Sequence, residues 1–183
     1  TKLIFNELPD TIEKPTKLID RNLCVIKDDY MYTARKLLKG DEDIIPGFLE
    51  LFRKNPSEYA RVKNITNYYG FTLYDLVSYD QKHNDENGED NRDGNSYNYS
   101  WNCGFEGSTR KQTVNKLRVR QMKNAMMMVL LAQGTPMIVS GDEFANSQNG
   151  NNNPYCQDNS TTWLNWDDIK KNKELLEFTK SLI

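Results

Sequence analysis

Segments with the composition of strands alternate with segments that have the period of helices, and the longest polar loops follow the strands. Short apolar runs typical of strands occupy Lys2–Phe5, Val62–Tyr69 and Pro136–Ser140. This alternation predicts an α/β fold with a parallel sheet, in which functional loops lie at the carboxyl ends of the strands. Three strands cannot form a closed (β/α)8 barrel, which usually takes about 250 residues, whereas this chain has 183.

Five segments have the apolar spacing of helices that bury one face. Asp28–Lys39 carries acidic residues in its first turn, and Gly40 follows it as a stop. The longest segment, Arg110–Gln133, has apolar residues at steps of three, four or seven and Gly134 as a predicted cap. The other expected helices are Ile44–Phe52, Phe71–Tyr79 and Asp167–Leu182.

Two long segments, Asp80–Gly107 and Asn146–Thr162, are rich in Asn, Asp and Gly and show no period. Loops longer than about 15 residues in a small domain are usually functional or disordered. The first loop contains four aromatic residues, which argue for order: Tyr97, Tyr99, Trp101 and Phe105. We therefore predict that both loops are functional.

The chemistry of these loops suits a sugar ligand. Sugars present hydroxyls that both donate and accept, on rings with apolar faces, and amides, carboxylates and aromatic rings satisfy both aspects. The alternative is that the asparagines serve turns, because Asn tolerates left-handed backbone angles. For a single Asn the two interpretations stay open.

Charge and hydropathy exclude several classes of protein. The net charge is −2, with acidic and basic residues interspersed, so we expect no nucleic-acid partner. No run approaches the roughly 18 apolar residues of a membrane span, and the first twenty residues lack the layout of a signal peptide. We expect a soluble chain that does not bind membranes.

The cysteines and the histidine count argue against a metal site. Cys24, Cys103 and Cys156 are far apart and odd in number, and we expect free thiols in a reducing cytoplasm. His83 is the only histidine, so a zinc site that needs two is excluded from this chain. We expect neither a metal nor a cofactor.

Five motifs resemble those of bacterial glycogen-debranching, isoamylase-type enzymes of the α-amylase superfamily. They are GFTLYDLVSY at Gly70–Tyr79, KHNDENGEDNRDG at Lys82–Gly94, YSWNCGFEG at Tyr99–Gly107, QGTPMIVSGDEF at Gln133–Phe144 and GNNNPYCQDN at Gly150–Asn159. The resemblance implies that residues 1–183 form one domain, the C-terminal part of a catalytic (β/α)8 TIM barrel. It also implies α-1,6-glucosidase chemistry on glycogen or limit dextrins, with α-glucan such as glycogen or maltodextrin as partner.

Hydrolysis in this superfamily proceeds with retention and needs a carboxylate nucleophile and a protonated carboxyl about 5 to 5.5 Å apart. The family's His-Asp pair stands directly before Gly-Phe-Thr, and here these positions are Tyr68 and Tyr69. A phenol with a pKa near 10 cannot replace an anion at pH 7. The fifth-strand acid corresponds loosely to Glu7, which could instead be an exposed loop glutamate, and the nucleophile strand is expected ahead of Thr1.

Asp142 and Glu143 are adjacent carboxylates after the last expected strand. Neighbouring residues on a strand point to opposite sides, so at most one faces a pocket, and the resemblance implies that this acidic end positions loops. His83 either binds a sugar hydroxyl or orders its loop. Our candidate substrate-binding residues are Tyr68, Tyr69, His83, Asn84, Asn87, Arg92, Asp142 and Tyr155.

Three functions remain open. The residues could be the C-terminal barrel portion of an active α-1,6-glucosidase, a non-catalytic glucan-binding or regulatory module, or a structural fragment that completes a barrel with another chain. The two tyrosines and the missing nucleophile predict that this chain alone is inactive. Exposed strand edges predict self-association or pairing with an N-terminal barrel segment.

Overall fold

The computed structural model describes residues 3–6, 23–56 and 59–183. Their sheet has four strands in the order β1-β2-β3-β4, and every neighbouring pair is parallel. The strands are β1 (Leu3–Asn6), β2 (Leu23–Ile26), β3 (Ala60–Lys63) and β4 (Thr135–Pro136). The predicted α/β class with a parallel sheet is confirmed.

The order of the strands identifies the kind of parallel sheet. In a doubly wound sheet the strand order reverses at a switch point, whereas the strands of a (β/α)8 barrel follow one another in chain order. Here each strand pairs with the next one along the chain. The sheet is therefore an open section of a barrel, with β1 and β4 at its edges.

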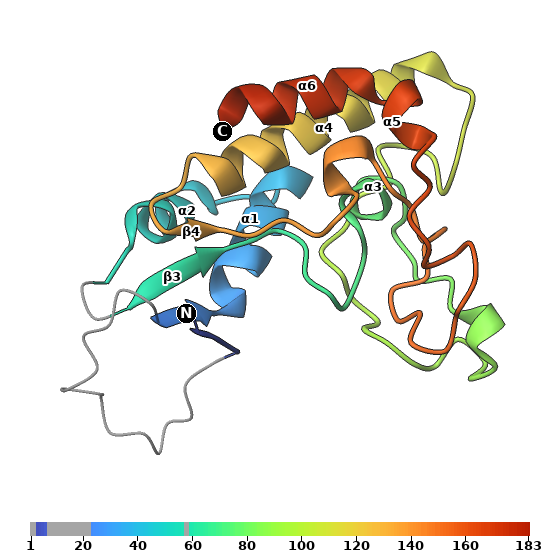
Figure 1. The fold of residues 1–183 in the computed structure, drawn as a ribbon, viewed down its shortest axis with the longest axis horizontal. Coiled ribbons are helices and arrows are strands. Elements are labelled where there is room, and N and C mark those ends of the chain that lie inside the picture. The colour runs from blue at the N-terminus through green and yellow to red at the C-terminus, as the bar shows by residue number, and fades with distance from the viewer. Residues whose placement is uncertain (1–2, 7–22, 57–58) are drawn as a thin grey trace.

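The helices pack on one another beside this sheet, and α1 contacts both α2 and α4, which in turn contacts α6. Figure 1 shows α4 and α6 side by side, and the long loops gathered at the end toward which β3 points. The main hydrophobic core forms between these helices from side chains that include Tyr30, Phe71, Leu73, Met122, Met126 and Leu175. The helices are α1 (Asp28–Lys39), α2 (Ile45–Arg53), α3 (Leu73–Leu76), α4 (Gln112–Leu130), α5 (Asp168–Lys171) and α6 (Lys173–Leu182).

The predictions for α1 hold at both ends. Asp28 and Asp29 lie in its first turn, and Gly40 ends it with φ 93°, a left-handed angle that glycine adopts without strain. The following helix, α2, is shifted by one residue from its expected bounds. The expected C-terminal helix is instead divided at Asn172, where α5 ends and α6 begins.

The strand predictions need four corrections. The sequence reading missed β2, although its four consecutive residues are all buried. The first strand is present as β1. All four of its residues are exposed, because β1 is an edge of an open sheet. The expected strand Val62–Tyr69 is instead β3, which ends at Lys63. Of the expected strand Pro136–Ser140 only Pro136 is paired, and it forms β4 with Thr135 at the other edge of the sheet.

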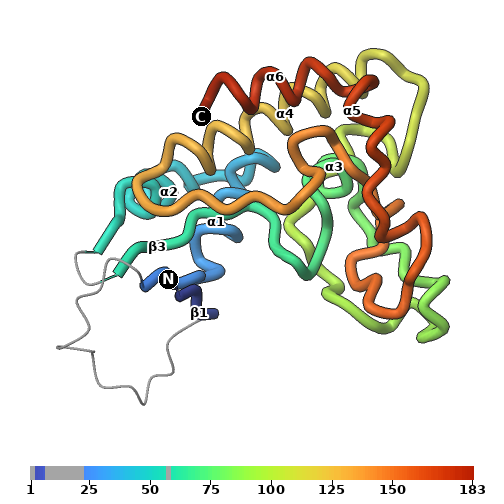
Figure 2. Tube along the Cα trace, in the orientation of Figure 1, coloured from blue at the N-terminus to red at the C-terminus, as the bar shows by residue number. Residues whose placement is uncertain are grey.

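The two expected long loops are confirmed as largely irregular chain. Each contains or borders one short 3-10 helix, at Asp85–Asn87 and Asp142–Phe144. The Cα trace shows the loops next to each other at the end of the molecule far from α2 (Figure 2). The expected helix at Phe71–Tyr79 shrinks to the single turn α3 between them, capped by Thr72, whose hydroxyl accepts from the Asp75 backbone N–H.

Candidate functional site

A pocket of about 200 Å³ opens at the carboxyl ends of the first three strands. Its lining residues are Asn6 at the end of β1, Ile26 at the end of β2, Asp28 at the start of α1, and Tyr69 beyond β3. This is the end of the sheet at which (β/α) barrels place their functional groups. The pocket is smaller than the ~300–1,000 Å³ of pockets for drug-sized ligands, so it has room for one small polar molecule.

Tyr69 joins this pocket to the neighbouring strand. Its phenol donates to Asp28 Oδ1 at 3.0 Å and to Asp28 Oδ2 at 3.2 Å. Burial, and then the hydrogen bond to Asp28, raises the pKa of Tyr69 to about 12. The phenol is therefore protonated and neutral at pH 7.

Tyr68 lies beside the pocket and is 73% exposed. Its hydroxyl accepts from Asn6 Nδ2 at 2.6 Å, and its ring meets Tyr69 edge to face with centroids 5.0 Å apart. The two tyrosines thus contact different elements, Tyr68 the end of strand β1 and Tyr69 the start of helix α1.

A second cavity, of about 250 Å³, lies between the two long loops and is lined by His83, Asp85, Glu86, Gln148, Asn149, Asn151 and Thr161. The imidazole Nε2 of His83 lies 3.3 Å from Glu106 Oε1, and the ring packs edge-on against Tyr79. His83 therefore both borders a polar cavity and orders its loop, so both of its expected roles remain compatible with its position.

Two asparagines of the first loop hold the second loop in place. Asn84 is fully buried, and its Nδ2 donates to Asn152 Oδ1 at 2.9 Å. Asn87 Nδ2 donates to the Asn153 carbonyl at 2.9 Å, and its Oδ1 accepts from Asn151 Nδ2 at 2.8 Å. These amides bond within the protein, so Asn84 lies behind the surface that a ligand would contact, whereas Asn87 is partly exposed.

Asp142 is also buried, and it links β4 to the segment after β3. One carboxylate oxygen accepts from the Thr66 hydroxyl, and the other accepts from the Leu73 backbone N–H at 2.8 Å. Burial raises the pKa of Asp142 to about 6. Glu143 accepts from the Gly141 backbone N–H at 2.9 Å. The two adjacent carboxylates therefore accept hydrogen bonds from different segments, Asp142 from the segment after β3 and Glu143 from its own turn.

Sequence reasoning missed two acidic residues, Asp28 and Asp75. Asp75 in α3 is fully buried and accepts from the Ser147 hydroxyl and from the Gln148 backbone N–H, and burial raises its pKa to about 6. The apolar run Leu23–Ile26, followed after Lys27 by an acidic residue, was a signal for Asp28. Asp75 stands inside the motif Gly70–Tyr79, but its own position looks like any polar position in a short helix.

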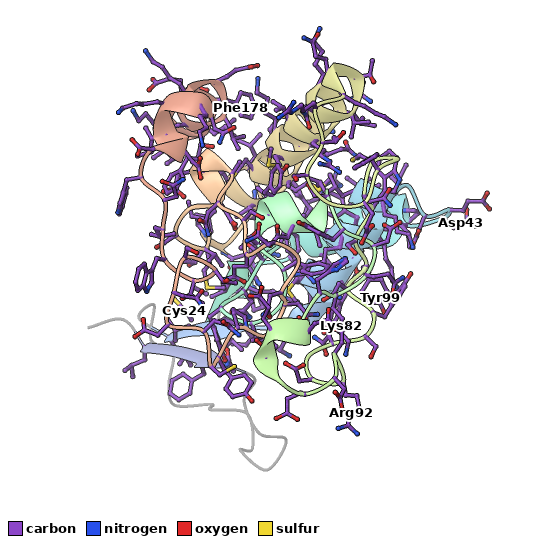
Figure 3. All side chains as sticks on the ribbon, turned by 90° about the vertical axis from the view of Figure 1, so that its right-hand side faces the viewer. Cys24, Asp43, Lys82, Arg92, Tyr99 and Phe178 are labelled. Atoms are coloured by element: carbon purple, nitrogen blue, oxygen red, sulfur yellow. The ribbon has the colours of Figure 1, made fainter. Side chains whose placement is uncertain are left out.

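Two other candidate residues lie on the outer surface. Arg92 points away from the protein (Figure 3), close to Asp90. Tyr155 is 68% exposed, and its hydroxyl donates to Glu89 Oε1 at 3.4 Å. Glu7, the candidate acid, lies outside the described residues. The structure thus places Tyr69 in one pocket with Tyr68 beside it, Asp142 between β4 and the segment after β3, and the other five described candidates on the long loops.

Comparison with known proteins shows extensive sequence similarity. The chain is 48% identical over 143 residues to a glycogen operon protein GlgX homolog of Mycobacterium tuberculosis, a match that covers 78% of this chain and 19% of that protein. It is 47% identical over 135 residues to a glycogen debranching enzyme of Dickeya chrysanthemi, covering 73% and 20%. The chain is a homologue of part of the glycogen debranching enzymes.

The chain spans about a fifth of the length of these glycogen debranching relatives. No family model matches it. A crystal structure of pullulanase type I from Bacillus subtilis, complexed with maltose, superposes with a TM-score of 0.60 at 16% identity, over 88% of this chain and 21% of that one. This likeness confirms the α/β fold, which matches a part of that larger chain.

Two further observations concern this glycogen-debranching homologue. Among residues 3–6, 23–56 and 59–183, no group of three or more His, Cys, Asp or Glu side chains is placed to hold a metal ion. Within the same ranges, no helix has both the length and the apolar character that a membrane span needs. The three cysteines are free thiols, as expected.

Proposed function

We propose that this chain is an α-glucan-binding part of a glycogen-debranching-type barrel and that it does not hydrolyse glycosidic bonds by itself. The observation that carries the proposal is the neutral phenol of Tyr69 at the mouth of the strands, bonded to Asp28. The sequence motifs align this position with a carboxylate of the family.

The chemistry of retention explains why this exchange matters. The transition state resembles an oxocarbenium ion, and the enzymes stabilise its positive charge with carboxylates. A phenol with a pKa of about 12 carries no charge at pH 7. Tyr69 can still donate or accept a hydrogen bond, so the exchange removes charge stabilisation but keeps the capacity to bind hydroxyls.

Glucan binding is supported by the two cavities and by the relatives. The pocket at Tyr69 and the cavity at His83 both combine amide, carboxylate and aromatic groups, which suit sugar rings. The homologous debranching enzymes are named for action on glycogen, and the similar pullulanase was solved with maltose. We place the protein in the cytoplasm, where glycogen-type α-glucan is metabolised.

A second candidate function concerns a longer protein. Identity of 47–48% to debranching proteins favours an α-1,6-glucosidase in which these residues form the C-terminal part of the barrel. Under this alternative the nucleophile comes from another part of the longer protein, and Glu7 is the one candidate acid of this chain. The two candidates therefore differ in whether the barrel hydrolyses glucan once its remaining segments are present, and both predict that this chain alone is inactive.

One experiment on this chain tests the first candidate. Calorimetry with maltotetraose measures binding, and a reducing-end assay on glycogen measures hydrolysis by the same preparation. We expect a dissociation constant in the millimolar range or tighter and no hydrolysis above the buffer blank. Heat at the level of dilution would contradict glucan binding, and release of glucose would contradict inactivity.

We also infer that the edge at β1 pairs with a further strand, from a second copy of this chain or from an N-terminal barrel segment. All four residues of β1 are exposed, among them Leu3, Ile4 and Phe5. An exposed apolar edge offers unpaired backbone groups to another strand.

A further inference from the structure

The pocket at the strand ends still contains one carboxylate, that of Asp28. Asp28 follows β2 and is the first residue of α1, so it enters the pocket from the strand adjacent to the one that carries Tyr69. The side chain is partly exposed and therefore accessible from the pocket. The start of α1 favours a negative charge at this position.

Tyr69 fixes the direction of this carboxylate. Its phenol lies at nearly equal distances from the two oxygens, 3.0 and 3.2 Å. A carboxylate offers about four acceptor positions, so one shared donor leaves most of them available. The two oxygens are held as a pair, which is the arrangement that accepts from two neighbouring hydroxyls of one sugar ring.

The rest of the pocket suits a sugar ring rather than an inorganic ion. Ile26 provides an apolar wall, and Asn6 provides an amide at the end of β1. Beside the pocket stands the exposed ring of Tyr68, fixed by the bond from Asn6 Nδ2 at 2.6 Å. Apolar and aromatic surface next to a carboxylate and an amide matches the two aspects of a pyranose.

We propose that Asp28 is the carboxylate that binds the hydroxyls of a glucose unit at this pocket and that Tyr69 positions it. Asp28 thereby supplies a carboxylate after β2, at the carboxyl ends of the strands, where the segment after β3 contributes the phenols of Tyr68 and Tyr69. This inference rests on the proposed glucan binding and assigns it to one pocket. It gives Asp28 a binding role and no catalytic one.

The test is calorimetry with maltotetraose on four proteins: the unaltered chain, Asp28→Asn, Tyr69→Phe and the double variant. A fifth protein, Asp43→Asn, is the matched control, because it makes the same chemical change at an exposed residue beyond the end of α1, whose first residue lines the pocket. Figure 3 shows the side chain of Asp43 projecting away from the protein. We expect Asp28→Asn to weaken binding by about 10-fold or more, as for the loss of charge-assisted hydrogen bonds. The control should bind as the unaltered chain does.

The double variant tests the positioning role of Tyr69. If Tyr69 acts through Asp28, Tyr69→Phe weakens binding alone but adds nothing to Asp28→Asn, whereas independent contacts would add. Melting curves show which variants are folded. If Asp28→Asn does not fold, Tyr69→Phe alone still tests whether this pair of residues contributes to binding.

The outcomes distinguish this inference from the proposed function. No binding by the unaltered chain overturns glucan binding itself. If the unaltered chain binds and both Asp28→Asn and Tyr69→Phe change its dissociation constant by less than twofold, the role of Asp28 is overturned. Glucan binding then occurs elsewhere, and the His83 cavity is the next candidate.

Discussion

Asn84 and Asn152, 68 positions apart, bond to each other twice. Asn84 Nδ2 donates to Asn152 Oδ1 at 2.9 Å, and the Asn152 backbone N–H donates to Asn84 Oδ1 at 3.0 Å. Both residues are buried. Side-chain amides therefore join the two long loops, together with the hydrogen bond from the His83 backbone N–H to the Gly150 carbonyl at 2.7 Å. No strand pairing holds these loops together within the described residues.

Replacing Asn84 should loosen both loops. Asn84→Ala removes these bonds and the one to the Asp93 carbonyl, leaving buried amide groups of Asn152 without partners. We expect a loss of about 2–4 kcal/mol in the free energy of unfolding, measured by urea denaturation. Asn95→Ala, at an exposed residue of the same loop, should change it by less than ~0.5 kcal/mol. Equal effects of the two variants would contradict the assigned role of Asn84.

Gly94 sits against the same contact. Its φ is +69°, and a Cβ there would lie 2.2 Å from Asn152 Oδ1. Gly88 has a similar φ of +77° but open space around it, so both alanine variants incur the same backbone strain and only Gly94→Ala adds a clash. We expect Gly94→Ala to be less stable than Gly88→Ala by about 1–3 kcal/mol in thermal or urea unfolding. Equal stabilities would show that the loops shift freely.

Asp142 should make stability fall as pH rises through the weakly acidic range. Burial raises its pKa to about 6 in the folded protein, against about 3.9 in an unfolded chain. The folded state then binds more protons between these values, so this stabilising contribution is complete below about pH 4 and is lost as pH rises through about 6. Asp142→Asn cannot titrate, and its amide can donate to Thr66 and accept from Leu73.

The measurement is urea denaturation at several values between pH 4 and pH 7. Relative to the unaltered chain, Asp142→Asn should gain on the order of 2 kcal/mol across this range, and Asp43→Asn should follow the unaltered chain. A constant difference between Asp142→Asn and the unaltered chain would mean that the carboxyl group does not titrate there.

The sequence predicted well those elements whose local signals agree with their packing. The α1 helix has acidic residues at its start, a glycine at its end and one buried face, and both ends match. The four buried residues Leu23–Ile26 were a continuous apolar run, a pattern typical of a parallel strand, but four residues give too short a period to separate strand from helix. The exposure of β1 depends on what lies beside it, which its own residues do not encode.

The site was harder to predict than the fold. Nothing local separates an asparagine that meets a sugar from one that meets another asparagine 68 residues away, so Asn84 and Asn87 looked like binding residues. The bond between Tyr69 and Asp28 joins residues on different elements, and only the tertiary structure shows it. The motif alignment did locate Tyr68 and Tyr69 at the strand ends, because Gly-Phe-Thr fixed their register.

The edge strand leads to the last prediction, on association. Ile4 in β1 is 60% exposed and Ile45 in α2 is 59% exposed, so Ile4→Lys and Ile45→Lys remove the same apolar group at equal exposure. Only β1 also presents backbone groups at a sheet edge, and lysine on an edge strand opposes pairing with another strand. Sedimentation velocity should show concentration-dependent association of the unaltered chain and of Ile45→Lys, and a shift toward monomer for Ile4→Lys. A monomer at every concentration of the unaltered chain would show that this edge does not drive self-association, and dissociation by Ile45→Lys alone would place the contact on α2.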